Sequence, residues 1–593
     1  MLVTRPELEN VAEKLQGKTF LALDTETTGL YAFKEDRIFS LIIADHTDQY
    51  YFNFQMYPGI SKSEVLDRQE VYEFLQPLFR NPSITWFMHN AKFDMWMLHA
   101  DGVELAGNIH CTMATGRVLY NKHMSYAMAR MAKEIGYEKD DTVTEYIKKN
   151  KLYEMVQRPG KATKTKDMHF DQVPLELVQP YGDLDGKITM ELGIYQLEKL
   201  SSDEKLHAVF ENEKKLTKVC FEMEKVGIQV DMDFVQKALA HEQAIAYEAD
   251  EMFVELAGCP LIDSAKTLVP VFEYLELPYG KIKAGRPSFD DESLAKVDHD
   301  ISKILRKYRS AMKKANTYYE NFLYYADDKG VLHANIRQSG TDTGRFSYSD
   351  PNLQNLPKEE KLDEEFVVRR SFVPREDYCF VMIDYDQQEY KLMLDYANET
   401  KLIGKILNDG LDVHQATADM MGVDRRRAKT LNFMILYGGG IAKLAGMLDI
   451  SERDAKKLRS KYFDALPKIP DWTRKVISAA EGRGYVFNWL GRKCHFDKGF
   501  EYKAPNHLIQ GGCADVVKVA MNRIHEFLKT KKSRMLVQIH DEILLEVHKD
   551  ELRIVEDVKS IMEKAYPFKH IPLTCGVDHS WKSWADKEKG APK

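Results

Sequence analysis

Short apolar runs separated by polar turns predict strands near the start of the chain, at 19–24, 38–44 and 50–54. Another apolar run at 84–88 leads into a helical pattern that begins at Ala91, and a longer helical pattern covers 173–200. Strands that alternate with helices in this way indicate an α/β domain. The stretch 158–166 carries Pro, Gly and several Lys, and it predicts an exposed loop.

A mostly helical pattern follows from 204 to about 325, and one of its helices is strongly basic. Apolar residues recur there at helical spacing, and the other faces carry Lys303, Arg306, Lys307, Arg309, Lys313 and Lys314. A run of charge is usually a solvated face, but cations aligned on a helix can also follow phosphates. Beside the motifs described below, the phosphate-following helix is the preferred interpretation.

The second half of the chain is predicted to hold a strand and a helix at 376–400, helices over 411–530, and two strands over 535–547 that meet at His540 and Asp541. With 593 residues the chain exceeds one core, and a prior of one domain per 100–200 residues predicts about three to five units. A hydrophobic content of 44% and a charged content of 30% indicate folding throughout.

Net charge and cysteines narrow the class of protein only slightly. The formal net charge of −8 does not decide for or against a nucleic-acid partner, because a basic groove can coexist with acidic sites. The seven cysteines are scattered without CxxC spacing, so neither a disulfide framework nor a zinc site is indicated. The start lacks a leader pattern and no stretch is apolar enough to span a membrane, so we expect a full-length cytoplasmic protein.

A first group of acids begins with Asp24 and Glu26, which stand two residues apart at the end of an apolar strand and therefore share one face. Paired carboxylates can bind divalent cations such as Mg²⁺, and two such ions stabilise the attacking and leaving oxygens of a phosphodiester. One Asp-x-Glu pair is more often an N-cap and a surface acid. Here Asp94 lies near the start of a helix after a second strand, and Tyr181 and Asp185 stand one helical turn apart.

A second group of acids lies far along the chain. Asp384 ends a predicted strand, and Asp541 and Glu542 lie at the tip of the predicted hairpin over 535–547. Either piece alone could be an ordinary polar turn. Together, strand-end acids from two distant segments can share one pair of metal ions.

A stripe of four side chains lies between these acids. Arg425, Lys429, Phe433 and Tyr437 are spaced by four residues, which places two cations and then two aromatics on one helical face. A nucleoside triphosphate fits such a stripe, with phosphates at the cations and sugar and base at the rings. Core packing would explain the rings but not why the cations share their face.

These motifs resemble two known families. Asp24-x-Glu26, Asn90-x-x-x-Asp94 and Tyr181-x-x-x-Asp185 are similar to the three motifs of the DEDDy exonucleases. The acids and the stripe resemble motifs A, B and C of family A DNA polymerases, as do the stretches 341–347 and 351–357 and those around Met223, Gly484, Gly491 and Asn506. The resemblance covers the chain from about residue 20 to Trp581.

The resemblance implies a fold and a division of the chain. It implies an α/β exonuclease domain (RNase H-like) plus an α+β right-hand polymerase domain with thumb, palm and fingers. The implied boundaries are 1–203 for the 3′-5′ exonuclease domain, 204–330 for the thumb, 331–408 and 531–593 for the palm, and 409–530 for the fingers. The implied activity is DNA-templated addition of deoxynucleotides to a primer 3′ end, with proofreading.

The resemblance also implies roles for individual residues. Two divalent ions per site, Mg²⁺ or Mn²⁺, are held by Asp24, Glu26, Asp94 and Asp185 in the exonuclease and by Asp384, Asp541 and the Tyr385 carbonyl in the polymerase. Catalytic roles go to Asp384, Asp541, Glu542, Lys429 and Arg425, and Tyr181 orients the attacking water. The nucleotide meets Arg425, Lys429, Phe433, Tyr437, Glu389 and Gln388. The DNA meets Arg345, Asn352, Gln354, Asn506, Gln510, His540 and Lys313.

The sequence departs from the family pattern around Asp384. Asp386, Gln388, Tyr390 and Lys391 replace the usual residues of motif A, and Met434 replaces a common glycine. These changes leave the metal acids intact, and they bear on fidelity and sugar selectivity.

Other functions are less well supported by the motifs. The alternatives are an exonuclease fused to a non-catalytic binding region, a single-subunit RNA polymerase or reverse transcriptase, and a structural clamp. The expected partners are primer-template DNA and dNTPs. The protein is expected to be a monomer of phage type that acts in the cytoplasm of a bacterial host. Because the distance from Gly227 to Gly344 matches an uninserted bacterial thumb, no thioredoxin-type processivity factor is expected.

Overall fold

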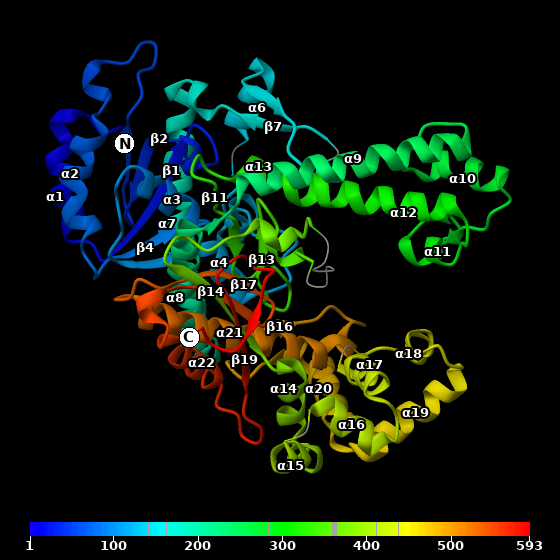
Figure 1. The fold of residues 1–593 in the computed structure, drawn as a ribbon. Helices are drawn as coiled ribbons and strands as arrows, with labels where there is room; N and C mark the ends of the chain where they lie inside the picture. The colour runs from blue at the N-terminus through cyan, green and yellow to red at the C-terminus, as the bar shows by residue number, and fades with distance from the viewer. Residues whose placement is uncertain are drawn as a thin grey trace.

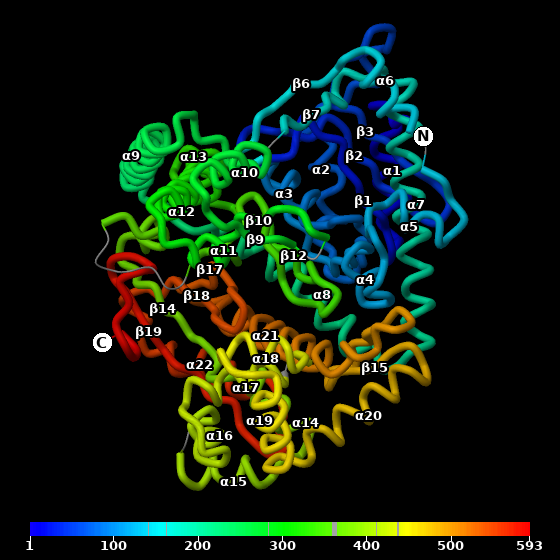
Figure 2. Tube along the Cα trace, turned by 90° about the vertical axis from the view of Figure 1, so that its right-hand side faces the viewer, coloured from blue at the N-terminus to red at the C-terminus, as the bar shows by residue number. Residues whose placement is uncertain are grey.

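The computed structural model of the chain describes residues 1–139, 141–161, 163–282, 284–357, 365–410, 412–436 and 438–592. Two five-stranded sheets form the centres of two halves, and a pair of long helices projects from between them (Figure 1). The N-terminal sheet and the helices that lie in sequence between two strands of the second sheet are at opposite ends of the molecule (Figure 2). None of the described helices has the length and apolarity that a bilayer span requires.

The N-terminal sheet has the order β3-β2-β1-β4-β5, in which β1 runs antiparallel to β2 and parallel to β4. Its strands are β1 (Phe20–Thr27), β2 (Ile38–Ala44), β3 (Gln49–Asn53), β4 (Thr85–Met88) and β5 (Asn108–Cys111). Every residue of β2 is buried, which explains why its sequence is apolar except for Ser40. The four strands predicted from the apolar runs are thus confirmed, and β1 begins one residue and ends three residues later than expected.

Helices pack on the N-terminal sheet, and α7 crosses β1, β2 and β3. They are α1 (Leu8–Gln16), α2 (Arg68–Phe79), α3 (Lys92–Ala100), α4 (Thr112–Leu119), α5 (Met128–Met131), α6 (Thr142–Asn150) and α7 (Leu175–Ser201). The expected loop over 158–166 is partly wrong, because β6 (Tyr153–Val156) and β7 (Thr165–Met168) form a hairpin that includes its end. Arg158 bridges that hairpin through an ion pair with Asp167 at 2.8 Å.

The projecting arm consists of α9 (Met232–Ala257) packed along α12 (Asp300–Lys313), as Figure 1 shows. The other elements of this part are α8 (Glu204–Val226), α10 (Ala265–Tyr274), α11 (Asp291–Ala295), α13 (Glu320–Tyr325), β8 (Ile228–Gln229), β9 (Gly280–Lys281), β10 (Pro287–Ser288) and β11 (Val331–Leu332).

The basic face of α12 is engaged by acids of the arm. Ion pairs join it to neighbouring elements: Arg306 to Asp291, Lys307 to Glu248, and Arg309 to Asp263; Lys314, just after α12, pairs with Glu242. The charge run therefore has structural partners, and it is not by itself evidence of phosphate binding. The exposed pairs among them contribute little stability.

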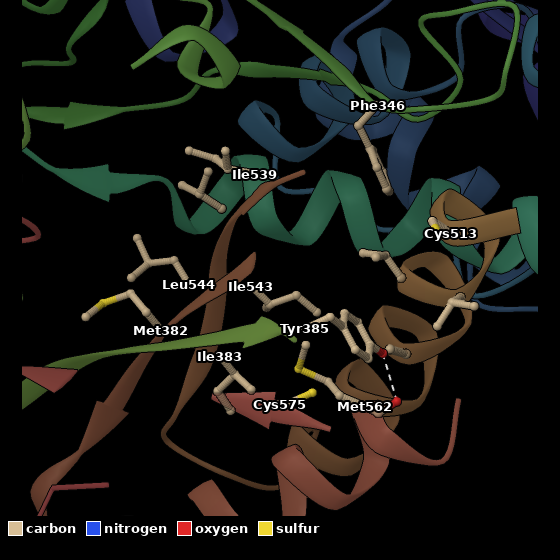
Figure 3. Packing of buried hydrophobic residues seen from close by; sticks show 14 of the residues in the cluster. Phe346, Met382, Ile383, Tyr385, Cys513, Ile539, Ile543, Leu544, Met562 and Cys575 are labelled. Atoms are coloured by element: carbon tan, nitrogen blue, oxygen red, sulfur yellow. Dashed lines mark hydrogen bonds between the residues drawn. The ribbon is translucent and has the colours of Figure 1, made fainter. Parts of the chain in front are cut away.

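The second sheet has the order β17-β18-β14-β19-β20, and β14 lies at its centre. Its strands are β14 (Tyr378–Tyr385), β17 (Arg534–Ile539), β18 (Glu542–His548), β19 (Cys575–Ser580) and β20 (Glu588–Lys589), and α22 (Ile554–Glu563) packs against it. Ile383 and Tyr385 point into the core beneath the sheet, where the Tyr385 hydroxyl donates to the Met562 carbonyl at 2.8 Å (Figure 3). Because side chains alternate along a strand, Met382 and Asp384 face the other side.

The remaining helices lie beyond the edge of this sheet, and the 25-residue helix α21 runs through their core. They are α14 (Gln388–Ala397), α15 (Thr400–Asp409), α16 (Val413–Met421), α17 (Arg425–Leu436), α18 (Ile441–Leu448), α19 (Glu452–Ala465), α20 (Lys468–Arg483) and α21 (Ala504–Leu528). Two further hairpins are β12 (Asn335–Arg337) with β13 (Ser347–Ser349), which precedes β14, and β15 (Tyr485–Phe487) with β16 (Lys493–His495), which lies between α20 and α21.

Candidate active sites

The first site is built on the end of strand β1, where Asp24 and Glu26 share one face of the sheet. Each offers a carboxylate oxygen within 4.8 Å of the other and of Asp185 on α7. The buried Asp94, on α3, accepts a hydrogen bond from the Thr25 hydroxyl at 2.7 Å. The structure thus brings together the four acids that the sequence motifs had singled out.

The four acids are buried together, and this changes their pKa values. Burial, followed by repulsion from Asp94 and Asp185, raises the pKa of Asp24 well above its usual range. Burial and then Asp185 raise the pKa of Glu26 to about 8, and burial raises that of Asp94 to about 7. Carboxyl groups crowded in this way are stabilised by a divalent cation, and hard oxygen ligands at this spacing fit one.

A lysine that the sequence motifs did not identify completes this site. The Lys139 ammonium lies 2.5 Å from Asp185 Oδ2 and 4.4 Å from the centroid of the Tyr181 ring. Burial alone lowers the pKa of Lys139, but Asp185 and Tyr181 raise it above its usual value. Lys139 precedes α6, far in sequence from both partners, and no local pattern distinguishes it from other lysines.

A cavity of about 420 Å³ opens in front of these groups and is lined by Asp24, Glu26, Tyr181, Asp185, Phe93 and His169 among others. Tyr181 is half-buried at its wall, one turn of α7 before Asp185. The arrangement places a phenol, an ammonium and a carboxylate cluster around one space. It can therefore hold a metal ion and a water molecule next to a phosphodiester.

The second site surrounds the tight turn between β17 and β18. His540 and Asp541 form this turn, and His540 takes a left-handed backbone with φ of 56°. Such a conformation is uncommon for residues other than glycine and occurs often at functional sites. The Tyr385 amide donates to the Asp541 carbonyl at 3.3 Å, so the turn lies against the end of β14.

A cavity of about 350 Å³ beside the turn gathers many residues that the sequence had predicted from distant segments. Those lining it are Arg345, Gln354, Gln388, Glu389, Phe433, His540 and Asp541, together with Phe346, Gln387, Tyr390, His414, Cys513, Ala514 and Gln538. The cavity thus contains aromatic rings, a carboxylate from the hairpin turn, and amide groups.

Two interactions shape the wall of this cavity. Arg345 forms an ion pair with Glu389, so the carboxylate at the start of α14 is held toward the 341–347 loop. Gln354 donates to the Gln538 carbonyl at 2.9 Å and accepts from the His540 amide at 3.3 Å, which supports the turn. No local signal in the sequence indicated either contact.

Asp384 and Glu542 line a different cavity, of about 410 Å³, on the face of the sheet opposite to Tyr385. They are paired directly across β14 and β18, and Asp386 and Asp578 lie on the same wall. Asp541 directly precedes Glu542, the strand partner of Asp384, yet Asp541 and Asp384 line different cavities. Within the described part of the chain they do not form a compact three-acid group like that of the first site.

Three of the four residues of the predicted stripe, Arg425, Lys429 and Phe433, lie on α17. Lys429 Nζ lies 6.0 Å from the centroid of the Phe433 ring, which stands 5.7 Å from the His414 ring. Arg425 pairs with Asp412 at 3.0 Å, one turn before the exposed Lys429. Tyr437 lies outside the described residues.

The other predicted DNA contacts are spread over three elements and do not line the cavity beside the turn. Asn352 accepts a hydrogen bond from the Gln354 amide at 3.0 Å and thus supports that loop. Asn506 and Gln510 lie half-buried on α21, and the Asn506 Oδ1 atom is buried without a partner among the described residues. Lys313 is exposed at the end of α12.

Comparison with known proteins relates both sites to established families. Residues 231–586 match the family described as DNA polymerase family A, and residues 1–201 match a 3′-5′ exonuclease family. The polymerase match covers more than half of the chain. The two matched regions contain the second and the first site respectively.

Individual relatives agree with these matches. DNA polymerase DpoZ of Salmonella phage PMBT28 is 29% identical over 91% of this chain and 91% of its own length. The thermostable DNA polymerase I of Thermus thermophilus is 34% identical over 65% of this chain, which spans about half the length of that relative. A solved structure of the POL domain of Pol1 from M. smegmatis in complex with DNA primer-template and dNTP has a TM-score of 0.80, covers 98% of this chain and 99% of its own, and is 24% identical.

Proposed function

The chain belongs to DNA polymerase family A, and we propose that it adds deoxynucleotides to a primer 3′ end on a DNA template and proofreads the product with its own 3′-5′ exonuclease. Its fold combines an N-terminal exonuclease domain with a right-hand polymerase domain, as predicted from the sequence. We assign 1–203 to the exonuclease, 204–330 to the thumb, 331–408 and 531–593 to the palm, and 409–530 to the fingers.

One observation supports the polymerase activity above all. A single cavity gathers Arg345, Glu389, Phe433 and Asp541 from four segments that are far apart in the sequence. A cavity of about 350 Å³ lies in the range of small-molecule sites, about 300–1,000 Å³. Phe433 offers a ring for the sugar and base, and Arg425 and Lys429 on the same helix offer charge for the triphosphate.

Both activities are metal-dependent in these families, and we propose Mg²⁺ at both sites, with Mn²⁺ as a substitute. Bound ions would stabilise the charge that develops on the phosphoryl group in transfer. In the exonuclease, Asp24, Glu26, Asp94 and Asp185 would hold them. Tyr181 and Lys139 would orient the attacking water and the scissile phosphate.

In the polymerase, Asp384, Asp541 and the Tyr385 carbonyl are the proposed metal ligands, with Glu542 beside them. Glu389 lines the cavity beside the turn, and its carboxylate is proposed to meet a ribose 2′-hydroxyl and so to favour deoxynucleotides. Gln388, buried against the Cys513 carbonyl at 3.4 Å, would fix the start of helix α14.

Primer-template DNA is proposed to contact Arg345, Asn352, Gln354, Asn506, Gln510, His540 and Lys313. We further propose that the protein acts as a monomer. The arm tip between α9 and α12 is built from short helices and a two-stranded hairpin, so we expect that adding thioredoxin leaves product length unchanged. Longer products on addition of thioredoxin would contradict this.

Primer extension tests the proposed function most directly. A 5′-labelled primer on a DNA template is incubated with each dNTP or NTP, with Mg²⁺ or with EDTA. Template-directed extension with dNTPs and its loss with EDTA are expected. Extension with NTPs at an equal rate would indicate an RNA polymerase, and degradation without any extension would indicate an exonuclease fused to a binding region.

A further inference from the structure

A lysine near the end of the sequence reaches the acidic face of the palm. The ammonium of Lys587 lies 3.2 Å from Glu542 Oε2, and the Glu542 side chain is only 5% exposed. Lys587 and β20 lie beyond residue 586, where the match to the polymerase family ends. The family match thus does not extend to them.

The segment that carries Lys587 is anchored on both sides. Before it, Trp584 is fully buried, its amide donates to the Phe372 carbonyl at 3.0 Å, and its ring stacks under Arg369 at 4.7 Å. After it, β20 pairs with β19, and the Gly590 amide donates to the Val577 carbonyl at 2.9 Å. Lys587 is thus held over the sheet between two fixed points, next to the end of β14.

The acids beneath Lys587 are crowded. Asp384 and Glu542 stand directly opposite each other on antiparallel strands, a pairing that places Cβ atoms about 4.5–5.5 Å apart and is destabilising for like charges. On the other side of Asp384 the paired residue is Gly576, so no side chain separates Asp384 from the cavity there. Two carboxylates at this spacing could chelate one divalent cation between them.

The two oxygens of Glu542 differ in their surroundings. Oε2 accepts from Lys587, whereas Oε1 is buried and has no hydrogen-bond partner among the described residues. A buried carboxylate that lost the cation paired with it would be costly to keep charged. It would therefore attract another cation, which Asp384, directly opposite it across the two strands, is able to share.

We propose that Lys587 is a positioning residue of the polymerase site. Its ion pair with Glu542 keeps that carboxylate from binding metal, so that divalent cations bind between Asp384 and Asp541 rather than between Asp384 and Glu542. This inference rests on the proposed polymerase function. Since removal of Lys587 would leave the Glu542 carboxylate to share an ion with Asp384, it is expected to strengthen metal binding while it misplaces the ion.

Metal binding is measured first, without DNA or nucleotide. The exonuclease acids are removed by Asp24→Ala with Glu26→Ala, and free Mn²⁺ is followed by electron paramagnetic resonance during a titration. Lys587→Met is expected to tighten Mn²⁺ binding about tenfold, a typical size for coupling between neighbouring charges. Lys587→Arg keeps the charge and should bind Mn²⁺ like the parent. Lys582→Met, an exposed lysine of the same segment, is the matched control and should also bind like the parent.

Primer extension with the same variants supplies the second readout. For Lys587→Met we expect kcat to fall about tenfold while KM for dNTP stays within about twofold. In a Glu542→Gln background Lys587→Met should change Mn²⁺ affinity and kcat by less than about twofold, because Lys587 acts through Glu542. A folding defect would lower the active fraction without tightening Mn²⁺ binding.

The outcomes separate this inference from the proposed function. Unchanged Mn²⁺ affinity in Lys587→Met, or an equal change in the Glu542→Gln background, would overturn the role of Lys587. If Lys587→Met alone does not fold, two other variants decide. The role of Lys587 is overturned if Lys587→Arg differs from the parent in Mn²⁺ affinity. It is also overturned if Lys587→Met with Glu542→Gln differs in Mn²⁺ affinity from Glu542→Gln alone. A parent protein that never extends a primer would defeat the proposed function instead, and the Mn²⁺ titration would still report on Lys587.

Discussion

The exonuclease acids should make metal binding strongly pH-dependent. Glu26 has a pKa of about 8 and Asp94 of about 7, both raised mainly by burial. Below these values the carboxyl groups keep their protons, and a metal ion must displace them. Metal affinity should therefore rise with pH and level off above about pH 8.

The size of the effect follows from these pKa values. The ionised fraction of Glu26 is about fiftyfold lower at pH 6 than at pH 8, so removing its proton weakens metal binding by that factor. This corresponds to about 2 kcal/mol at 1.36 kcal/mol per pKa unit. Displacing the Asp94 proton adds roughly another tenfold over the same range. Metal binding should release more protons at pH 6 than at pH 9, because Glu26 and Asp94 are largely ionised at pH 9.

The same pKa values predict how the metal-free protein responds to pH. A carboxyl group whose pKa is raised on folding binds more protons in the folded state than in the unfolded state. Its contribution to the free energy of unfolding is therefore complete below the unfolded pKa and is lost as the pH rises through the folded value. We expect the metal-free exonuclease domain to lose stability between about pH 5 and pH 8, and Mg²⁺ to restore it.

Isothermal titration calorimetry with Mg²⁺ at pH 6, 7 and 8 tests the metal prediction. Asp541→Asn weakens the polymerase site so that the exonuclease site dominates, and two buffers with different ionisation enthalpies report the protons released. Glu26→Gln is the matched variant and should flatten the pH dependence. An affinity that changes less than about threefold between pH 6 and 8, well below the change expected from Glu26 alone, would refute the reasoning.

Three further predictions concern single residues. Asp24→Ala with Glu26→Ala should abolish 3′ degradation and leave extension unchanged, and Asp541→Ala should abolish extension and leave degradation unchanged. Each change removes metal ligands worth several kcal/mol of transition-state stabilisation. Loss of both activities in one folded variant would contradict two separate sites. Lys139→Met should slow 3′ degradation about tenfold, the scale of one lost charge-assisted contact, and leave extension unchanged; equal degradation rates would make Lys139 merely structural. With the exonuclease disabled, Phe433→Tyr should raise the use of ddNTP relative to dNTP about two- to tenfold, because the added hydroxyl can replace the missing 3′-hydroxyl as a hydrogen-bonding group; an unchanged ratio would mean that Phe433 does not meet the sugar.

The sequence by itself determined the local placement of the chemistry. Alternation along β1 places Asp24 and Glu26 on one face, and one helical turn joins Tyr181 to Asp185. The turn between β17 and β18 was likewise predicted from its flanking apolar runs. These features depend only on the repeat of a strand or helix, which a short stretch of sequence already specifies.

Tertiary structure alone decided which distant groups share each site. Lys139 beside Asp185, Arg345 beside Glu389, and Lys587 beside Glu542 join segments that no sequence period relates. Exposed and buried lysines look the same in a sequence, because their partners are chosen by how whole elements pack around a core. The charged side chains that surround a buried acid therefore become known only once the fold has brought them together.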